Sequence, residues 1–376
     1  MTHSRLVRLF DECGQSPWLD NLKREFITSG ALQGILDTGI RGLTSNPTIF
    51  QKAIQGSQDY DEQFRQLATL QHSPIESYWE LVIKDIQDAL DVFQPLYESS
   101  NRSDGFVSVE VDPNLARDTA ATEKAARELD IRVDRDNVMI KIPATQEGIP
   151  VIKTMISEGR NVNVTLIFSL ERYQEVMNAY IEGLEILGTK SEESLSGVSS
   201  VASFFISRVD TEIDKRLLKV GTLESIELCG TAAISQAKLA YQLFLKTFSG
   251  PRWAALVRRG ARVQRPLWAS TSTKNPSYPD TLYVDQLIGA HTVNTLPDNT
   301  MLAFNDHGTP STTIESDIDL AHTRWHALSE LGVDVSEVAN QLESEGVRSF
   351  QQSFTELIDA LKVKDQSFHQ YLSCQY

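Results

Sequence analysis

Short apolar runs alternate with longer helix-like segments along this chain. We interpret eight of the runs as strands, at residues 16–20, 41–46, 106–111, 138–143, 161–168, 200–206, 265–271 and 292–297. The segments between them include the helix-like residues 112–130, 169–187 and 232–248. Alternation of strands and helices favours parallel strands joined by crossover helices. Eight such units predict an α/β fold, a closed (β/α)₈ barrel of the TIM type.

The chain is long for such a barrel. It has 376 residues, whereas a typical example has about 250. We assign the surplus to helices at the N-terminus, to a long excursion after the second strand (residues 47–100), and to a helical C-terminal tail (residues 305–376). Because no Gly/Ser-rich or Pro-rich linker interrupts the chain, we expect a single barrel domain over residues 1–376, with the tail packed on it.

The C-terminal tail has one apolar face. Val347, Phe350, Phe354, Leu357 and Leu361 follow the three- and four-residue spacing of an amphipathic helix. Two arrangements would bury this face. The helix packs against the barrel as an ordinary outer helix, or it covers the mouth of the barrel.

The phase of three successive predicted strands places polar side chains together. Glu110, Lys141, Asn163 and Thr165 alternate with apolar residues, so each points away from the apolar face of its strand. The same alternation assigns Leu166 to an apolar face. We expect the apolar faces to meet the surrounding helices and the polar faces to point into the barrel. The four polar residues lie near the C-terminal ends of their strands, where barrel enzymes keep their chemistry.

Lys141 is the most informative of these residues. Desolvation inside a barrel disfavours the ammonium form of a lysine, and the neutral amine is the nucleophile that forms a Schiff base with a carbonyl. A nearby carboxylate would favour the charged form instead. The residues therefore allow two interpretations: a catalytic lysine, or a buried pair of Lys141 with Glu110 that only satisfies its own charges.

Composition and charge narrow the functional classes. Apolar residues make up 41% of the chain and charged residues 23%, as in ordinary globular proteins. The net charge of −16 argues against nucleic-acid and anionic membrane partners. No stretch is apolar enough for a membrane span, and the N-terminus does not resemble a secretory signal. Cys13, Cys229 and Cys374 match no metal or disulfide spacing, so we expect a reducing, cytoplasmic location.

Several motifs occur in the order found in one enzyme family. They are GLTSNPTIFQKAI (42–54), VMIKIPATQEGIPVI (138–152), NVNVTLIFS (161–169), SVASFFISRVDTEID (200–214) and RPLWASTSTKNPSYPDTLYVDQLI (265–288). In these segments the chain resembles the transaldolases, in the long form found mostly in bacteria. The resemblance runs from about Gly14 to Pro297, and several motifs in one order are more specific than a single short pattern.

The resemblance implies a class I aldolase barrel without a metal or an organic cofactor. The implied reaction moves a dihydroxyacetone unit from a ketose phosphate to an aldose phosphate. The usual substrates are sedoheptulose 7-phosphate and glyceraldehyde 3-phosphate, which give erythrose 4-phosphate and fructose 6-phosphate in the pentose phosphate pathway. We expect a monomer or a homodimer.

The resemblance also implies four catalytic roles. Lys141 forms the Schiff base, and Asp20 exchanges a proton with the hydroxyl on the fourth carbon of the donor. Glu110 moves protons during dehydration and hydrolysis through a water that Thr165 helps to hold. Without the resemblance, the residues favour a helix N-cap for Asp20 and an ordinary β-branched strand residue for Thr165.

Further residues are implied to bind the substrate. Asn46 would contact hydroxyls of the three-carbon unit, although an asparagine before Pro47 also suits a turn. Ser203 and Arg208 would lie near the oxygens and the phosphate of the donor, and Phe205 would form a pocket wall. The alternatives are a surface ion pair for Arg208 and a plain core position for Phe205.

One segment departs from the pattern of the better-known transaldolases. They have an arginine in a segment of the form ASxRN, whereas this chain has ASTSTKNP with Lys274 at that place. A lysine binds phosphate as a point charge, without the planar fork of an arginine. Ser270 and Ser272 could add hydroxyl donors.

Two other functions compete with this interpretation. A lyase resembling fructose-6-phosphate aldolase would protonate the intermediate and release dihydroxyacetone instead of transferring it. A sugar-phosphate sensor on a barrel scaffold would bind without catalysis, since a fold does not fix a function. The sensor would need the cations Arg208 and Lys274 but not an internal lysine accompanied by Asp20 and Glu110.

Overall fold

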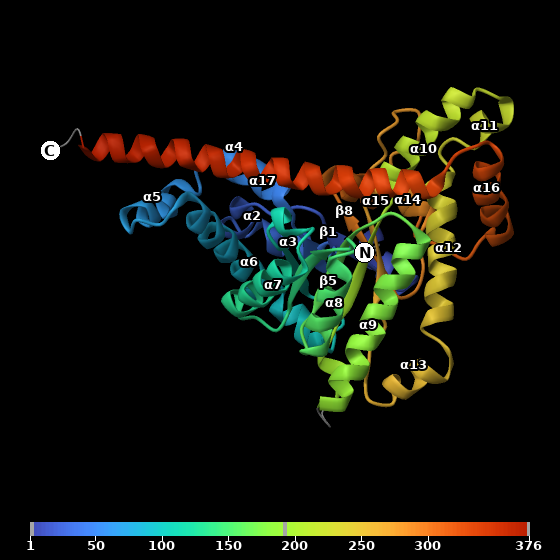
Figure 1. Cartoon of the computed structure of the whole chain (residues 1–376), viewed down its shortest axis with the longest axis horizontal. Coiled ribbons are helices and arrows are strands. Elements are labelled where there is room, and N and C mark those ends of the chain that lie inside the picture. Colours follow the sequence, from blue (N-terminus) through green and yellow to red (C-terminus); the bar gives the residue numbers. More distant parts are fainter. Residues whose placement is uncertain (1–3, 191–193, 374–376) are drawn as a thin grey trace.

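The predicted (β/α)₈ barrel is confirmed (Figure 1). A computed structural model describes residues 4–190 and 194–373. Within them, eight parallel strands pair in sequence order and close between the last strand and the first. The strands are β1 (Gln15–Leu19), β2 (Gly42–Thr44), β3 (Phe106–Glu110), β4 (Val138–Pro143), β5 (Val162–Ile167), β6 (Ser200–Phe205), β7 (Arg265–Ala269) and β8 (Thr292–Leu296).

Helices surround the barrel and extend it at three places. The connections between strands contain α2 (Arg24–Thr28), α3 (Ala31–Asp37), α4 (Pro47–Gly56), α5 (Asp61–Thr69), α6 (Pro74–Ser99), α7 (Thr119–Val133), α8 (Gly148–Ser157), α9 (Leu170–Lys190), α10 (Ser207–Val220), α11 (Leu223–Glu227), α12 (Ala232–Thr247), α13 (Gly250–Val257) and α14 (Leu282–Gln286). Outside the strands lie α1 (Arg5–Asp11), α15 (Asp298–His307), α16 (Ile318–Glu330) and α17 (Val335–Ser373). The excursion after the second strand is thus built of α4, α5 and α6.

The helix predicted at residues 112–130 starts later than expected. A short 3₁₀ turn, Pro113–Leu115, comes first, and the Asp112 side chain caps it. The Asp118 side chain then accepts a hydrogen bond from the Ala121 backbone and begins α7. Two aspartates in cap positions therefore divide what the sequence pattern showed as one segment.

The prediction for Leu166 is wrong. The pairing of β5 with β6 shifts register between Val164 and Ile167, and Leu166 has a positive φ of 60°. This bulge turns Leu166 out of the alternation, and its side chain lies against Gly346 of α17. Strand phase cannot be followed past a bulge, because the extra residue reverses which face each later side chain takes.

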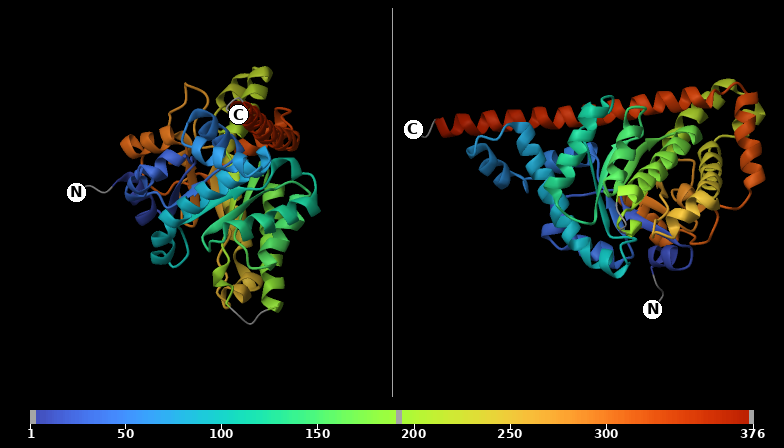
Figure 2. Two further views of the ribbon diagram at one scale, coloured as in Figure 1. Left: turned by 90° about the vertical axis from the view of Figure 1, so that its left-hand side faces the viewer. Right: turned by 60° about the horizontal axis from the view of Figure 1, so that its bottom comes forward.

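Helix α17 lies across the C-terminal end of the barrel, which we call the mouth (Figure 2). It has 39 residues and packs against α4, α6 and α10. The apolar residues of its expected face are all buried. One of them, Phe350, lines the cavity at the mouth, and the hydroxyls of Ser353 and Thr48 on α4 are 2.8 Å apart.

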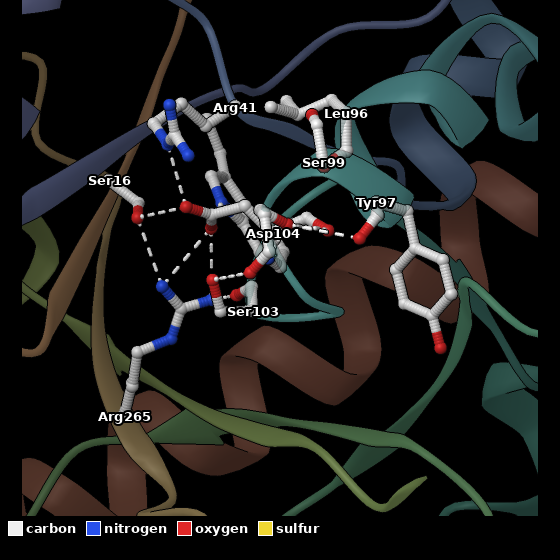
Figure 3. A network of polar contacts seen from close by, with 10 residues as sticks. Ser16, Arg41, Leu96, Tyr97, Ser99, Ser103, Asp104 and Arg265 are labelled. Atoms are coloured by element: carbon white, nitrogen blue, oxygen red, sulfur yellow. Dashed lines mark hydrogen bonds and ion pairs between the residues drawn. The ribbon is translucent and has the colours of Figure 1, made fainter.

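The opposite end of the barrel is closed by a charged cluster (Figure 3). Asp104 has no exposed surface and lies between Arg41 and Arg265, whose guanidinium nitrogens are 2.7 Å and 3.1 Å from its carboxylate oxygens. Ser16 Oγ donates to the same carboxylate at 2.8 Å, and Trp18 Nε1 donates at 3.4 Å. We call Ser16, Trp18, Arg41, Asp104 and Arg265 the floor cluster.

Candidate active site

A cavity of about 130 Å³ opens at the mouth of the barrel, beneath α17. We call it the inner cavity. Nine of the ten side chains predicted for the site line it: Asp20, Asn46, Lys141, Thr165, Ser203, Phe205, Arg208, Ser270 and Lys274. The tenth, Glu110, contacts Lys141 from within the barrel. The structure therefore brings all of the predicted site residues together.

Lys141 lies in β4 with only 5% of its surface exposed. Its Nζ donates a hydrogen bond to the Ser45 carbonyl at 3.2 Å and lies 3.4 Å from Glu110 Oε2. On the side of α17, Nζ is 5.9 Å from the centre of the Phe350 ring. The amine is thus enclosed by the residue that follows β2, by β3 and by α17, and it faces a small cavity, as a nucleophile must.

Glu110 is paired in register with Lys141 across β3 and β4. Burial raises the pKa of the Glu110 carboxyl, and the charge of Lys141 opposes that shift. Among the described residues, neither Glu110 Oε2 nor the buried Thr165 Oγ1 has a hydrogen-bond partner. Buried polar atoms are normally satisfied, so these two retain capacity to bind and move a proton or a water.

Asp20 follows the last residue of β1, on the wall of the inner cavity. Its carboxylate accepts a hydrogen bond from Thr44 Oγ1 at 2.8 Å, and Thr44 Oγ1 is 2.6 Å from Thr295 Oγ1. Burial raises the pKa of Asp20, while Lys141 opposes the shift. The alternative of a helix N-cap is wrong, because Lys23 occupies the N-cap position of α2.

Asn46 serves two purposes at once. Its side-chain oxygen accepts a hydrogen bond from the Ile49 backbone at 3.0 Å and caps α4. Its side chain also lines the inner cavity. Since the cap uses the oxygen, the amide nitrogen remains as a donor toward the cavity.

Ser203 belongs to a chain of hydrogen bonds across the barrel. Its hydroxyl donates to Asn163 Oδ1 at 2.8 Å, and Asn163 Nδ2 donates to Ser108 Oγ at 2.9 Å. Asn163 therefore points into the barrel as its strand phase predicted. Phe205 is 6% exposed and its ring centre is 5.1 Å from that of Phe168, so it is at once cavity wall and core.

Arg208 and Lys274 bring two cations to the inner cavity. The Arg208 guanidinium lies over the Phe205 ring, 5.3 Å from its centre. In the described part of the chain it forms no ion pair, so the alternative of a surface pair is wrong. Lys274 Nζ donates to Ser272 Oγ at 2.7 Å and also has no carboxylate within ion-pair distance there. Burial lowers the pKa of Arg208, and Asp20 and Glu110 oppose this shift.

The backbone at Ser270 is strained where β7 ends. Ser270 has a φ of 57°, in the left-handed region that a serine rarely adopts. Its hydroxyl is 2.9 Å from that of Ser207, at the start of α10. Such conformations cost roughly 1–3 kcal/mol and are concentrated at functional sites. The turn directs residues 271–274 along the cavity.

Sequence reasoning missed five residues of the inner cavity: Thr44, Ala269, Thr295, Pro297 and Phe350. Thr44 and Thr295 line it beside Asp20, and Phe350 closes it from α17. Thr44 lies two residues before Asn46, so the alternation of side chains along a strand predicts that both point to the same face. The spacing of Phe350 identified an apolar face but could not say which residue would meet Lys141.

The described residues offer neither a metal-binding group nor a membrane-spanning helix. No group of three or more His, Cys, Asp or Glu in residues 4–190 and 194–373 is placed to hold a metal ion. No helix in those ranges combines the length and the apolar composition that crossing a membrane requires.

Comparison with known proteins gives a consistent result. Residues 17–361 match the model of the transaldolase/fructose-6-phosphate aldolase family. The chain is 49% identical to a transaldolase of Parafrankia sp. over 93% of this chain and 95% of that protein. It is 48% identical to a transaldolase of Thermobifida fusca, over 94% of this chain and 96% of the relative. It is 47% identical to transaldolase 1 of Streptomyces avermitilis, over 96% of this chain and 95% of that protein. The chain belongs to the transaldolase/fructose-6-phosphate aldolase family.

Proposed function

We propose that this protein is a transaldolase that uses Lys141 as its Schiff-base nucleophile. The observation that carries the proposal is a buried amine, 5% exposed, that lies 3.4 Å from Glu110 and shares a small cavity with Asp20. A structural ion pair needs one carboxylate, whereas this chemistry needs two that act at different carbons of the substrate. Burial raises the pKa of each carboxyl, so each one holds a proton more readily than an exposed carboxyl does.

In the first half of the reaction, the neutral amine of Lys141 attacks the second carbon of the ketose phosphate. Loss of water from the carbinolamine gives an iminium, with Glu110 supplying the proton to the leaving hydroxyl. Asp20 accepts the proton of the hydroxyl on the fourth carbon. The bond between the third and fourth carbons breaks, its electrons pass into the iminium, and an aldose phosphate leaves.

In the second half, the enamine left on Lys141 attacks the carbonyl carbon of another aldose phosphate. Asp20 returns its proton to the carbonyl oxygen, and an iminium forms again. Water then attacks the iminium carbon and the new ketose phosphate is released. The buried Glu110 Oε2 and Thr165 Oγ1, without hydrogen-bond partners in the described chain, support a role in holding this water.

The substrates we propose are phosphorylated sugars. Arg208 and Lys274 supply positive charge to the inner cavity of a protein whose net charge is −16. Asn46, Ser203 and Ser270 add polar groups for hydroxyls. The substrate set is sedoheptulose 7-phosphate or fructose 6-phosphate as donor, with glyceraldehyde 3-phosphate or erythrose 4-phosphate as acceptor, in the pentose phosphate pathway.

We further propose that the chain acts as one domain in the cytoplasm, as a monomer or a homodimer. The packing of α17 on α4, α6 and α10 supports one domain, because this helix completes the catalytic cavity. Cys13 and Cys229 are free thiols, which is the usual state in a reducing compartment. Cys374 lies outside the described residues.

Borohydride trapping tests the proposal. Reduction in the presence of fructose 6-phosphate is expected to fix a three-carbon adduct on Lys141, detected by intact mass and located by peptide mapping. An adduct on another lysine, or none, refutes the mechanism, and the second result is what a non-catalytic sensor gives. Addition of erythrose 4-phosphate separates the remaining alternatives, because a transaldolase forms sedoheptulose 7-phosphate and a lyase releases free dihydroxyacetone.

A further inference from the structure

The inner cavity is small, with a volume of about 130 Å³. It holds Lys141, so the three-carbon unit that forms the Schiff base belongs there. The remainder of the donor, with its phosphate, extends away from Lys141.

A second and larger cavity adjoins the first. It has a volume of about 620 Å³ and lies between α2, α4 and the start of α15. We call it the outer cavity. Asp20, Ser272 and Pro297 line both cavities, so the two meet at the carboxylate that we assign to the fourth carbon. This places the first three carbons in the inner cavity and the later carbons on the outer side of Asp20.

Helix α4 presents one face to the outer cavity. Ile49, Lys52, Ala53 and Gly56 line it, at the three- and four-residue spacing of one helix face. The opposite side of α4 packs on α17. There Gln51 Nε2 donates a hydrogen bond to Glu356 Oε2 of α17 at 2.6 Å. The position of Lys52 is thereby set by packing on the far side of its own helix.

Lys52 has no hydrogen bond or ion pair within the described residues, and its side chain is exposed. Arg208 and Lys274 also have no carboxylate within ion-pair distance there. Ser272, which accepts a hydrogen bond from Lys274 Nζ at 2.7 Å, lines the outer cavity together with Lys52. Burial lowers the pKa of Lys274, and the charges of Arg208 and Lys52 add to this shift while Asp20 opposes it. Unpaired like charges that converge in an acidic protein are arranged for an anion.

Two further cations, Lys23 and Arg24, line the outer cavity. Lys23 Nζ lies 5.4 Å from the centre of the Phe26 ring. Arg24 is engaged with Asp85 at 2.7 Å. Carboxylates also line the cavity, at Glu25, Asp59 and Asp298. They suit the hydroxyls of a polyol but repel a phosphate. We therefore place the phosphate between Lys52 and Ser272, because Ser272 also lines the inner cavity that holds Arg208 and Lys274.

Resting on the function proposed above, we propose that Lys52 of α4 is a third phosphate-binding cation, which selects phosphorylated sugars by holding their terminal phosphate beside Ser272, where Lys274 reaches it from the inner cavity. The ligand class is a sugar phosphate whose carbon chain continues past the fourth carbon. Lys52 takes no part in the bond-breaking steps, so it determines specificity and not the rate of chemistry.

The test is the substitution Lys52→Gln, with Lys52→Arg as the conservative variant. A charge-assisted hydrogen bond is worth about 1.5–3 kcal/mol, so Lys52→Gln is expected to raise the KM for fructose 6-phosphate roughly ten- to a hundredfold with kcat nearly unchanged. Turnover of unphosphorylated fructose should be the same in both proteins. Lys52→Arg should keep most of the affinity for fructose 6-phosphate. Lys246→Gln, on α12, removes the same charge elsewhere and should leave the KM unchanged.

A binding measurement separates this inference from the proposed function. Inorganic phosphate titrated calorimetrically should bind the Lys52→Gln variant at least about tenfold more weakly than the wild type, whatever reaction the enzyme catalyses. Equal phosphate affinities, or equal losses with fructose and fructose 6-phosphate, overturn the role of Lys52. Weaker phosphate binding in a protein that gives no borohydride adduct upholds the phosphate site and refutes only the Schiff-base mechanism.

Discussion

The two ends of the barrel hold buried carboxylates in opposite conditions. In the floor cluster, Asp104 is enclosed by donors from Ser16, Trp18, Arg41 and Arg265. Both of its oxygens are bonded, and its cations have no other carboxylate within reach in the described chain. A buried ion pair of this kind is costly to break, because removal of one partner leaves the other unpaired.

At the mouth, the same kinds of groups are left unsatisfied. Glu110 Oε2 is 3.4 Å from Lys141, too long for a good hydrogen bond, and has no other donor among the described residues. Thr165 Oγ1 is unpartnered, and Arg208 has no ion pair in the same part of the chain. A cluster whose polar groups are all bonded stabilises the fold, whereas a binding site keeps hydrogen-bonding capacity for its substrate.

The sharpest test of this comparison is Lys141→Ala. Loss of the nucleophile is expected to lower kcat by at least about 10⁴-fold. The fold should remain, because Glu110 is able to take the neutral form once its cation is gone. Steady-state kinetics and circular dichroism measure the two effects. Activity like that of the wild type contradicts the assigned role, and an unfolded variant would show that the mouth, too, is structural.

The floor cluster should respond in the opposite way. Asp104→Ala leaves Arg41 and Arg265 without their carboxylate and is expected to lower the free energy of unfolding by about 3–5 kcal/mol. The folded fraction should keep the wild-type kcat, since the cluster lies at the far end of the barrel from the cavity. Urea titration followed by tryptophan fluorescence gives the first quantity. An unchanged urea midpoint, or a fall in kcat without a loss of stability, would reverse the contrast between the two ends.

A smaller effect is expected in the pH dependence of stability. Because burial raises the pKa of Glu110 above its ordinary value of 4.5, the folded chain holds a proton that the unfolded chain releases. The free energy of unfolding therefore falls as pH rises from 4.5 toward the native pKa, by at most about 1.4 kcal/mol for each pH unit. Glu110→Gln cannot ionise, so its stability relative to the wild type should rise over that window.

Urea midpoints of both proteins, measured at several pH values, check this expectation. Parallel curves for Glu110→Gln and the wild type would mean that the carboxyl ionises as easily in the native state as in the unfolded chain. The polar groups of the active site would then be as well paired as those of the floor cluster, and the contrast between the two ends of the barrel would be wrong.

Much of the candidate site was predictable from local pattern. A period of two placed Glu110, Lys141 and Asn163 on the inner face of their strands, and the structure pairs the first two in register. The pattern failed at Leu166, where a bulge breaks the period. It also gave no reason to single out Lys52, because a lysine on a surface helix looks the same whether or not a cavity lies beside it.

Side-chain periodicity and motif spacing are properties of neighbouring residues, so the order of the eight strands, the inward direction of Lys141 and the family motifs follow from the amino-acid sequence alone. Which charges are paired follows only from the folded barrel. Asp104 meets Ser16 from 88 positions away and Arg265 from 161 positions away, while Lys52, Arg208 and Lys274 converge without carboxylate partners in the described chain. Ion pairing depends on distances that exist only after the barrel has closed.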